Sequence, residues 1–557
     1  MAKRRILIIG GVAAGTKAAA KCRRESPEAD ITIITDERYI SYAGCGLPYF
    51  IGSRMERGQL EVMQVAQFAA RNDVEILTEH RALSINAEHK TVLAKDLREG
   101  SEKEFAYDVL ILATGSSPFS PPLGGIDIKN IFTLRTIGDG EAIKSLVDSG
   151  RVKNAVIVGG GYIGLEVAEN LVERGVRVSI VEALEHICPR FDEEIAIMVQ
   201  NHLKEKGVTV YTGQKVVRFH GNDAGEVSHA ELENGDMIEA DMILWSVGVR
   251  PNTELAKTAG IELGESGAIK VDNRMQTSVP DIYAAGDCAE TTHVVTGRQV
   301  WIPLGSTANK MGRVAAINAC GGRETFPGVL GSSVVKVFEM NLATTGLTAK
   351  AARAEGYDVE TVLVPETDRA GYIPGFEVIV TKLVADRKTR RVLGGQVVGR
   401  GVVDKPIDIL VAAITMKATV DDLANMDFAY APPFSPAMSS TITAANTMRN
   451  KLAGKLNVIS PLEMKKMLDE RGEVELIDVR NEEMYAEKHI PGSRLIPWGE
   501  IRKKTGDLPK DKPIVTICNR GKSAYCVQLI LDHAGFEDVK TFEGGLAAYP
   551  FETESGK

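Results

Sequence analysis

The hydrophobic pattern of the chain alternates short apolar runs with helical segments, most clearly in two places. Residues 6–9 (Ile-Leu-Ile-Ile) and residues 155–158 (Ala-Val-Ile-Val) are apolar at every position. Such runs are typical of strands buried on both faces of a parallel sheet. Each is followed by a glycine-rich turn and a predicted helix, residues 16–24 and 165–174. The repeated order of strand, turn and helix predicts α/β domains built on parallel sheets.

The first turn reads Gly-Gly-Val-Ala-Ala-Gly, residues 10–15, and the strand after its helix, residues 31–35, leads to an acidic residue. Small residues let the backbone approach a pyrophosphate, the helix N-terminus attracts its charge, and a carboxylate accepts a hydrogen bond from a ribose hydroxyl. Valine replaces the middle glycine of the G-x-G-x-x-G pattern. The segment predicts a dinucleotide site formed by Gly10, Val12, Ala13, Ala14, Gly15 and Asp36.

The second turn, residues 159–164, has the full G-x-G-x-x-G pattern, and the next strand, residues 177–181, leads to Glu182. An acidic residue at this point hydrogen-bonds the ribose 2′-hydroxyl and repels a 2′-phosphate. The turn therefore predicts a second dinucleotide site that favours NADH over NADPH. Its residues are Gly159, Gly161, Gly164 and Glu182.

Composition narrows the class of protein. The 557 residues suggest roughly three to five domains. A net charge of −9 argues against a nucleic-acid partner. Seven cysteines without regular spacing fit a reducing compartment better than a disulfide framework. Because no apolar run reaches the ~18 residues of a membrane span, we expect a cytoplasmic protein without one. No metal site is expected.

Two nucleotide folds in series resemble the two-dinucleotide-binding flavoproteins, the pyridine nucleotide-disulfide oxidoreductase family, which hold FAD first and a nicotinamide nucleotide second. Residues 112–115 (Leu-Ala-Thr-Gly) and 245–248 (Trp-Ser-Val-Gly) resemble the family's paired crossover segments. Residues 282–287 (Ile-Tyr-Ala-Ala-Gly-Asp) resemble its late FAD segment. The resemblance covers roughly residues 1–450 and implies bound FAD. It adds Thr114, Gly115, Gly248, Gly286 and Asp287 to the predicted cofactor site.

Residues 41–49 (Ser-Tyr-Ala-Gly-Cys-Gly-Leu-Pro-Tyr) contain one cysteine, Cys45, with no partner within a helical turn. They resemble the S-F-x-N-C-G-L-P-Y signature of coenzyme A disulfide reductases and their persulfide-reducing relatives. The resemblance makes Cys45 the redox cysteine, with Ser41 and Tyr42 among the substrate-binding residues. Tyr42 replaces the signature's Phe, and Gly44 replaces an Asn beside the reacting sulfur.

A single thiol leaves two mechanisms open. Cys45 can form a disulfide with an external thiol, which gives a disulfide or persulfide reductase. It can instead be oxidised to sulfenic acid, which gives an NADH oxidase or peroxidase. Family peroxidases use a histidine in their first helix, and residues 1–24 contain none.

The third region, residues 326–450, resembles the family's dimerisation domain and implies a homodimer. Within it, residues 427–434 resemble a segment that reaches the partner subunit's cysteine. Tyr430 and Tyr372 match tyrosines near the reacting sulfur, where a phenol can protonate a leaving thiolate. In relatives, basic residues at the end of the first helix hold the ADP end of coenzyme A, and the resemblance assigns this role to Arg23 and Lys17.

A new pattern begins near residue 459 and resembles rhodanese domains. A buried strand, residues 514–517, ends at Cys518, which opens a loop that feeds a helix. Backbone N–H groups, the helix N-terminus and nearby cations would lower the thiol pKa and stabilise a bound persulfide. The loop residues assigned to this role are Arg520, Gly521, Lys522 and Ser523.

The expected fold class is therefore α/β, with two Rossmann-like nucleotide-binding domains, an α+β dimerisation domain and a C-terminal α/β rhodanese domain. Their expected bounds are 1–117 with 245–325 (FAD), 118–244 (NADH), 326–450 and 457–557.

The resemblance implies NADH-dependent reduction of coenzyme A persulfide, polysulfide or coenzyme A disulfide through Cys45, with sulfane-sulfur transfer by Cys518. The alternatives are an NADH oxidase or peroxidase that uses a Cys45 sulfenate, and a redox-sensing or sulfur-carrier protein.

Overall fold

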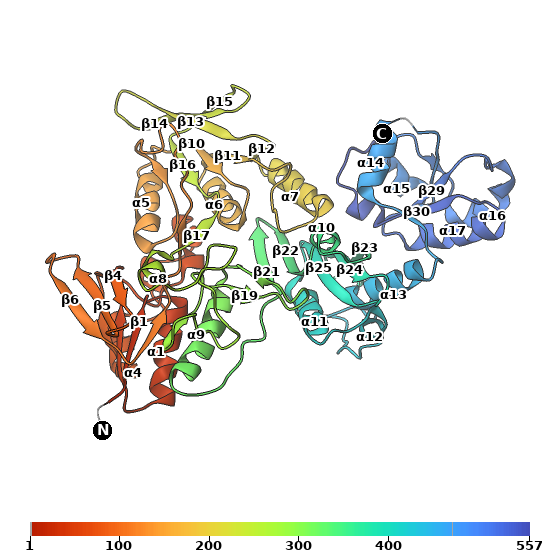
Figure 1. The fold of residues 1–557 in the computed structure, drawn as a ribbon. Coiled ribbons are helices and arrows are strands. Elements are labelled where there is room, and N and C mark those ends of the chain that lie inside the picture. The colour runs from red at the N-terminus through yellow and green to blue at the C-terminus, as the bar shows by residue number, and fades with distance from the viewer. Residues whose placement is uncertain (1–2, 471, 557) are drawn as a thin grey trace. The chain divides into compact units, whose positions relative to one another are not determined.

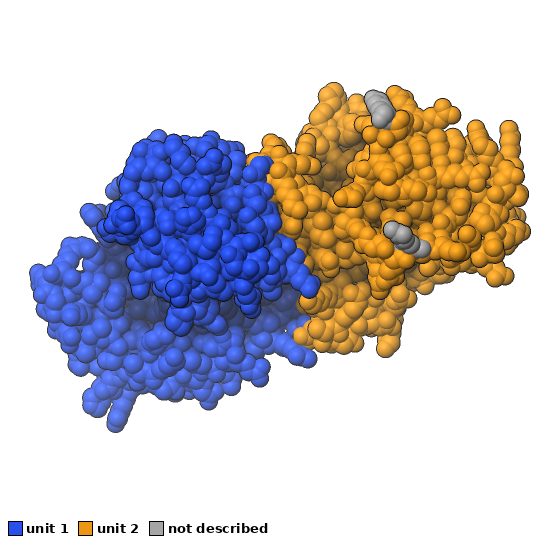
Figure 2. Space-filling model, turned by 90° about the horizontal axis from the view of Figure 1, so that it is seen from above, with its two compact units in different colours: residues 1–185, 207–331 blue, residues 186–206, 332–557 orange. Residues whose placement is uncertain are grey.

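The computed structural model describes residues 3–470 and 472–556, which form two compact units (Figures 1 and 2). Unit 1 comprises Met1–Glu185 and Gly207–Gly331, and unit 2 comprises His186–Lys206 and Ser332–Lys557. Within the described ranges, no helix has both the length and the apolar character needed to cross a membrane.

The first nucleotide fold of unit 1 is a five-stranded parallel sheet in the order β18-β7-β1-β2-β3. Ile6 of β1 lies between Ile31 and Val109 of its two neighbours. Helices α1 and α9 pack against each other beside this sheet. The bounds are β1 Arg5–Ile9, α1 Ala13–Glu25, β2 Asp30–Ile34, β3 Glu75–Leu77, β7 Val109–Leu112, β18 Ile282–Ala284 and α9 Gly305–Ala319.

The second nucleotide fold is a five-stranded parallel sheet in the order β12-β11-β10-β16-β9. All but one residue of β10 and every residue of β16 are buried, as their uninterrupted apolar sequences predict. The bounds are β9 Ile131–Phe132, α5 Ile137–Asp148, β10 Asn154–Val158, α6 Tyr162–Glu173, β11 Arg177–Glu182, β12 Thr209–Thr212 and β16 Met242–Trp245.

Smaller elements complete unit 1. Two three-stranded antiparallel sheets extend from the nucleotide folds, and β8 pairs with β17 where the chain passes between them. The bounds are α2 Leu47–Ile51, α3 Arg57–Leu60, α4 Val65–Asn72, β4 His80–Asn86, β5 Thr91–Asp96, β6 Glu102–Ala106, β8 Ser116–Pro118, β13 Val216–Gly221, β14 Val227–Leu232, β15 Met237–Glu239, β17 Val249–Pro251, α8 Glu254–Thr258, β19 Thr291–Thr292 and β20 Gln299–Val300.

Unit 2 begins with a five-stranded antiparallel sheet in the order β21-β22-β25-β24-β23. Helix α7 packs with it, because buried Lys382 of β24 bonds Asp192 and Glu194 at the start of α7. The bounds are α7 Glu193–Glu205, β21 Ser333–Val337, β22 Met340–Gly346, α10 Ala349–Ala354, β23 Val359–Thr367, β24 Val378–Asp386, β25 Val392–Gly399, α11 Asp404–Thr415, α12 Val420–Ala424 and α13 Ser440–Leu452.

The C-terminal part of unit 2 is a five-stranded parallel sheet in the order β26-β30-β29-β27-β28. It joins the antiparallel domain through Lys451, which pairs with Glu360 of β23 and with buried Glu543. The bounds are β26 Val458–Ile459, α14 Pro461–Asp469, β27 Glu475–Asp478, α15 Glu482–Glu487, β28 Arg494–Leu495, α16 Ile501–Lys504, β29 Ile514–Ile517, α17 Lys522–His533 and β30 Val539–Phe542. The predicted fold class is confirmed.

Candidate functional site

Cys45 lies on a single 3-10 turn, Gly44–Gly46, that leads directly into α2. It is an exposed free thiol, whereas the other six cysteines are buried or only partly exposed. Helix α2 has five residues, so the dipole at its N-terminus, beside this thiol, is that of a very short helix. A Cβ added at Gly44 would meet only the Tyr42 ring, at 4.0 Å, so the side of the turn where the signature has Asn is open.

Tyr42 is a buried residue of the segment that carries Cys45. Its side chain is only 5% exposed and packs beside Glu37. Burial and then the Glu37 carboxylate raise the pKa of the Tyr42 phenol. The ring is therefore part of the core, and the substrate role of Tyr42 stays a prediction. Ser41 is half-buried, its N–H bonds the Gly11 carbonyl, and its substrate role stays a prediction.

The residue four positions after Cys45 reaches the second nucleotide fold. The Tyr49 hydroxyl donates to Glu166 of α6 at 3.3 Å. Burial raises the pKa of Glu166 to about 7, although the Tyr49 bond opposes the shift. Burial also raises the pKa of Tyr49 to about 12. Helix α2, which follows Cys45, is thus joined to α6 of the second nucleotide fold through a carboxyl group whose pKa is near neutral.

The first dinucleotide turn is built by close backbone contacts. A Cβ at Gly10 would lie 2.1 Å from the Ala113 carbonyl oxygen, and one at Gly15 would lie 1.9 Å from that of Gly10. Val12 caps the 13-residue helix α1 without a side-chain hydrogen bond, which leaves the helix N-terminus for an anion. Asp36 is exposed after β2 and pairs with Arg81 at 3.3 Å. Ala13 and Ala14 form the first turn of α1.

The second turn fits a dinucleotide more closely. A Cβ at Gly159 would lie 2.4 Å from the Ser246 carbonyl oxygen. A Cβ at Gly164 would lie 2.3 Å from the Gly159 carbonyl oxygen. A Cβ at Gly161 would meet no atom within 4 Å, so a pyrophosphate has room there. The Glu182 carboxylate at the end of β11 accepts from the Gly160 N–H at 2.8 Å.

The crossover segments lie side by side. The Thr114 hydroxyl donates to the Asn252 carbonyl at 2.7 Å, and the Asn252 amide donates back at 2.8 Å. Gly115 and Gly248 have φ of 69° and 102°, a region that favours glycine. These contacts join the end of β7 to the residue after β17, beside the pairing of β8 with β17.

Asp287 follows β18 and the left-handed Gly286, which packs against Ala14. Burial raises the pKa of Asp287, with Arg135 opposing the shift. Its half-buried carboxylate accepts a hydrogen bond from the Ser116 hydroxyl at 3.3 Å. A half-buried carboxylate beside a tight glycine turn can accept further hydrogen bonds from a hydroxyl-rich ligand chain, so the residues present fit FAD.

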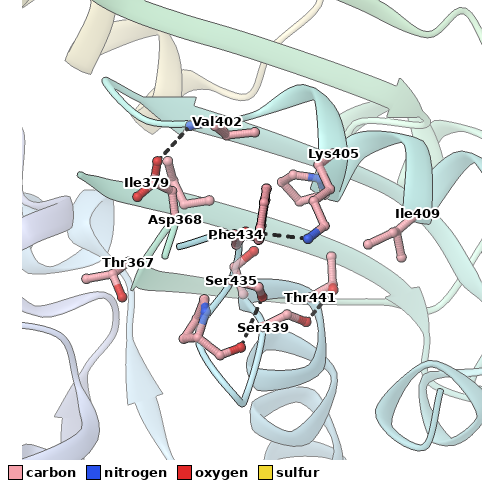
Figure 3. Close-up of a pocket in the computed structure, with 13 residues that line it drawn as sticks. Thr367, Asp368, Ile379, Val402, Lys405, Ile409, Phe434, Ser435, Ser439 and Thr441 are labelled. Atoms are coloured by element: carbon pink, nitrogen blue, oxygen red, sulfur yellow. Dashed lines mark hydrogen bonds between the residues drawn. The ribbon is translucent and has the colours of Figure 1, made fainter. Parts of the chain in front are cut away.

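Tyr372 and Tyr430 meet on the surface of unit 2. A side-chain hydrogen bond from Tyr430 raises the pKa of Tyr372, and the two side chains are 72% and 51% exposed. The segment that carries Tyr430 continues into a pocket lined by β23, β24 and α11 (Figure 3). In it, Lys405 Nζ donates to the Phe434 carbonyl at 3.5 Å. The two tyrosines named separately from the sequence are therefore one exposed pair.

The basic residues predicted for the ADP end of coenzyme A differ in their surroundings. The Arg23 guanidinium donates to the backbone carbonyls of Asn72, Pro27 and Asp73. These bonds hold the end of α1 to the turn after α4. Lys17 is half-buried on α1. The coenzyme A roles of Arg23 and Lys17 stay predictions.

Cys518 stands at the end of β29 and is only 5% exposed. The Gly521 N–H donates to its sulfur at 3.1 Å, and the left-handed Gly521, at φ 88°, starts the 12-residue helix α17. Gly545 closes the other side, since a Cβ there would lie 2.4 Å from the Cys518 carbonyl oxygen. The loop is thus a preformed cradle that aims an N–H group at the sulfur.

The charges around this cradle are arranged differently from the prediction. Arg520 donates to Glu366 of β23 at 3.0 Å. Lys522 is exposed and Ser523 half-buried at the start of α17. The antiparallel domain therefore competes with any bound sulfur species for the Arg520 guanidinium.

Sequence reasoning missed Glu166, Tyr49 and Glu366. The signal for the first two was present, since each lies within a recognised motif. Glu366 is 154 residues from Arg520, and no local pattern marks it. Within residues 3–470 and 472–556, no cluster of three His, Cys, Asp or Glu side chains is placed to hold a metal ion.

Comparison with known proteins agrees with this geometry. Residues 4–312 match the family described as pyridine nucleotide-disulphide oxidoreductase, residues 332–442 match its dimerisation domain, and residues 460–550 match the rhodanese-like domain.

Individual relatives cover most of the chain. The NAD(P)H sulfur oxidoreductase (CoA-dependent) of Pyrococcus abyssi is 37% identical over 80% of this chain and 98% of its own. An NADH oxidase of Methanocaldococcus jannaschii is 36% identical over 81% of this chain and 100% of its own. The solved structure of an NAD-dependent persulfide reductase from A. fulgidus is 40% identical with a TM-score of 0.92, and the match covers 98% of this chain and 100% of that one.

Proposed function

Because the chain belongs to the pyridine nucleotide-disulphide oxidoreductase family, we propose that it reduces coenzyme A persulfide, polysulfide or coenzyme A disulfide with electrons from NADH. The observation that carries the proposal is the exposure of Cys45 as a lone free thiol at the surface of unit 1. A lone thiol needs a second sulfur from outside the chain. The attached rhodanese-like domain makes sulfane sulfur the natural source.

Enzymes of this family use FAD and NAD(P)H, and the two turns supply a place for each. When bound, FAD takes up a hydride equivalent from the nicotinamide and gives two electrons to sulfur. The residues that would hold FAD are those of the first turn together with the half-buried carboxylate of Asp287. Gly161 and Glu182 would hold the nicotinamide nucleotide. Glu182 favours NADH, because a 2′-phosphate would meet its carboxylate.

At Cys45 the thiolate attacks the inner sulfur of a coenzyme A persulfide. A Cys45–coenzyme A disulfide forms and hydrosulfide leaves. Two electrons and one proton then return Cys45 to its thiolate and release coenzyme A thiol. With coenzyme A disulfide as substrate, the first leaving group is coenzyme A thiolate instead. Tyr430 of the partner subunit in a homodimer would donate the proton that the leaving thiolate needs.

Cys518 supplies the sulfane sulfur. Its thiolate takes one sulfur atom from a polysulfide and becomes a persulfide, which the Gly521 N–H stabilises as an anion. A coenzyme A thiolate then takes the outer sulfur, which regenerates Cys518 and forms the substrate of Cys45. The similarity to the Pyrococcus sulfur oxidoreductase and the A. fulgidus persulfide reductase supports this substrate class.

The deciding experiment is anaerobic turnover of the holoenzyme with coenzyme A persulfide. We expect one sulfide released for each NADH oxidised, with NADH loss under peroxide alone at least about tenfold slower. Equal or faster NADH loss with peroxide or oxygen would overturn the proposal in favour of an oxidase.

The NADH oxidase is the second candidate, because a relative that bears that name shares 36% identity over most of the chain. It would use a Cys45 sulfenate. The absence of a histidine from residues 1–24 weighs against a peroxidase. No turnover with any sulfur or oxygen acceptor would instead favour a sensor or carrier.

A further inference from the structure

A second pair of cysteines lies in unit 1, where helices α1 and α9 pack closely. The two helices meet at Gly312, where a Cβ would lie 2.4 Å from the Ala14 carbonyl oxygen. Cys22 is near the end of α1, and Cys320 is the C-cap of α9. Although they are 298 residues apart, the Cys320 thiol donates to the Cys22 carbonyl at 3.9 Å.

The two thiols also contact each other. A hydrogen bond between them is the largest influence on both, lowering the pKa of Cys320 and raising that of Cys22. Ser26 and then Arg4 lower the pKa of Cys320 further, whereas burial and Glu25 oppose the shift. Cys22 is fully buried, and Cys320 is partly exposed. An external disulfide can therefore reach the sulfur of Cys320, whereas the sulfur of Cys22 is accessible only from within the protein.

We propose that Cys22 and Cys320 form a second redox site, a dithiol that small disulfides oxidise to an intramolecular disulfide linking α1 to α9. The site is distinct from Cys45, and it does not depend on the proposed function. Its substrate class is a low-molecular-weight disulfide small enough to reach the partly exposed sulfur of Cys320.

The exchange proceeds in two balanced steps. The Cys320 thiolate attacks a disulfide RSSR, forms a Cys320–SR bond and releases RS⁻. The Cys22 thiol then loses its proton and attacks the Cys320 sulfur, and a second RS⁻ leaves. The protein loses two electrons and two protons, and RSSR becomes two RSH. Because Cys22 already contacts Cys320, the second step needs no large rearrangement.

The disulfide would act on the first nucleotide fold. It closes a loop that contains the second glycine-rich turn and the Asp287 segment, and such a cross-link reduces the freedom of the unfolded chain. The N-terminal end of α1 faces the predicted pyrophosphate. Oxidation is therefore expected to make unit 1 hold FAD to a higher temperature.

The test uses the full-length holoenzyme and bis(2-hydroxyethyl) disulfide as the probe. Peptide mapping without reduction should recover a Cys22–Cys320 cross-linked peptide. The midpoint of thermal flavin release should rise by about 5 °C or more and return to its starting value after dithiothreitol.

Cys320→Ala should lose both the cross-linked peptide and the shift. Cys526→Ala, which removes a partly exposed cysteine of α17, is the matched control and should keep both. Recovery of only mixed disulfides on Cys320, or an equal thermal shift in Cys320→Ala, would overturn the proposal. Neither result bears on turnover at Cys45.

Discussion

The two cysteines assigned to sulfur chemistry occupy opposite environments. Cys45 is exposed on a three-residue turn, with open space at Gly44 beside it. Cys518 is 5% exposed, and its sulfur already accepts a backbone N–H. A preformed cradle suits a thiol that holds a small sulfur anion, whereas an open turn suits one that accepts a large substrate. The difference teaches that the C-terminal domain by itself supplies the backbone donor for the Cys518 sulfur. The surroundings of the Cys45 sulfur are completed only when a substrate binds.

The strongest way to break this comparison is Cys45→Ser. We expect NADH-linked reduction of coenzyme A disulfide and persulfide to fall by about 10³-fold or more, because Cys45 is the thiol proposed to form the mixed disulfide with coenzyme A. Stopped-flow reduction of the bound flavin by NADH should stay near the wild-type rate. Retained steady-state turnover would refute the single-thiol mechanism.

Cys518→Ser tests the sulfur-transfer role proposed for the C-terminal domain. Sulfur transfer from polysulfide or thiosulfate to a thiol should fall by about 10²-fold or more, while coenzyme A disulfide reduction changes less than about twofold. Cys526→Ser, on the helix α17 that follows the Cys518 loop, is the control. If both activities disappear together in Cys518→Ser, the two sites are obligately coupled and the modular picture is wrong.

The carboxyl group beside the Cys45 helix should leave a pH signature on stability. Glu166 has a folded pKa of about 7, above its ordinary 4.5, so the folded state holds this proton more tightly. Its stabilising effect is complete below about pH 4.5 and is lost as the pH rises to about 7, a change of about 3 kcal/mol. Denaturant unfolding across this range should show that loss in the wild type. In Glu166→Gln the loss should be smaller by this amount, and an unchanged profile would contradict the assignment.

Tyr430→Phe tests the dependence of Cys45 on its surroundings. We expect kcat for coenzyme A disulfide to fall about tenfold, because the phenyl ring packs equally well but has no proton to donate. Tyr372→Phe is the paired control, since the two hydroxyls contact each other. An unchanged kcat in Tyr430→Phe, with a normal dimer by size-exclusion chromatography, would leave Tyr430 as a packing residue.

The smallest effect is expected from Glu366→Gln. This substitution tests whether the ion pair between Glu366 and Arg520 influences sulfur transfer at Cys518. A neutral amide holds Arg520 less firmly, so the guanidinium is freer to bind an anionic sulfur donor. Sulfur transfer from thiosulfate should rise about two- to fivefold through a lower KM. Arg520→Ala should lower it. A fall in Glu366→Gln would mean that the ion pair positions the cradle.

The sequence by itself determined the chemistry-bearing segments of this protein. The glycine-rich turns, the acidic residues at the strand ends, and the strand that delivers Cys518 are local patterns, because nucleotide and sulfur cradles are made from consecutive backbone groups. The fold class followed from the same patterns and is confirmed. Cys45 stood out because it is alone in a recognisable motif.

Only the tertiary structure decided how distant residues share these segments. In the folded protein Tyr42 is buried beside Glu37, and the Arg23 guanidinium donates hydrogen bonds to three backbone carbonyls. The Tyr49 hydroxyl donates to Glu166. The fold also joined Arg520 to Glu366 across 154 positions and brought Cys320 to Cys22. Such pairings depend on which faces pack together, and no local periodicity encodes them. The sequence therefore shows where a charged residue or a thiol lies along the chain, but only the folded structure shows which residue it contacts.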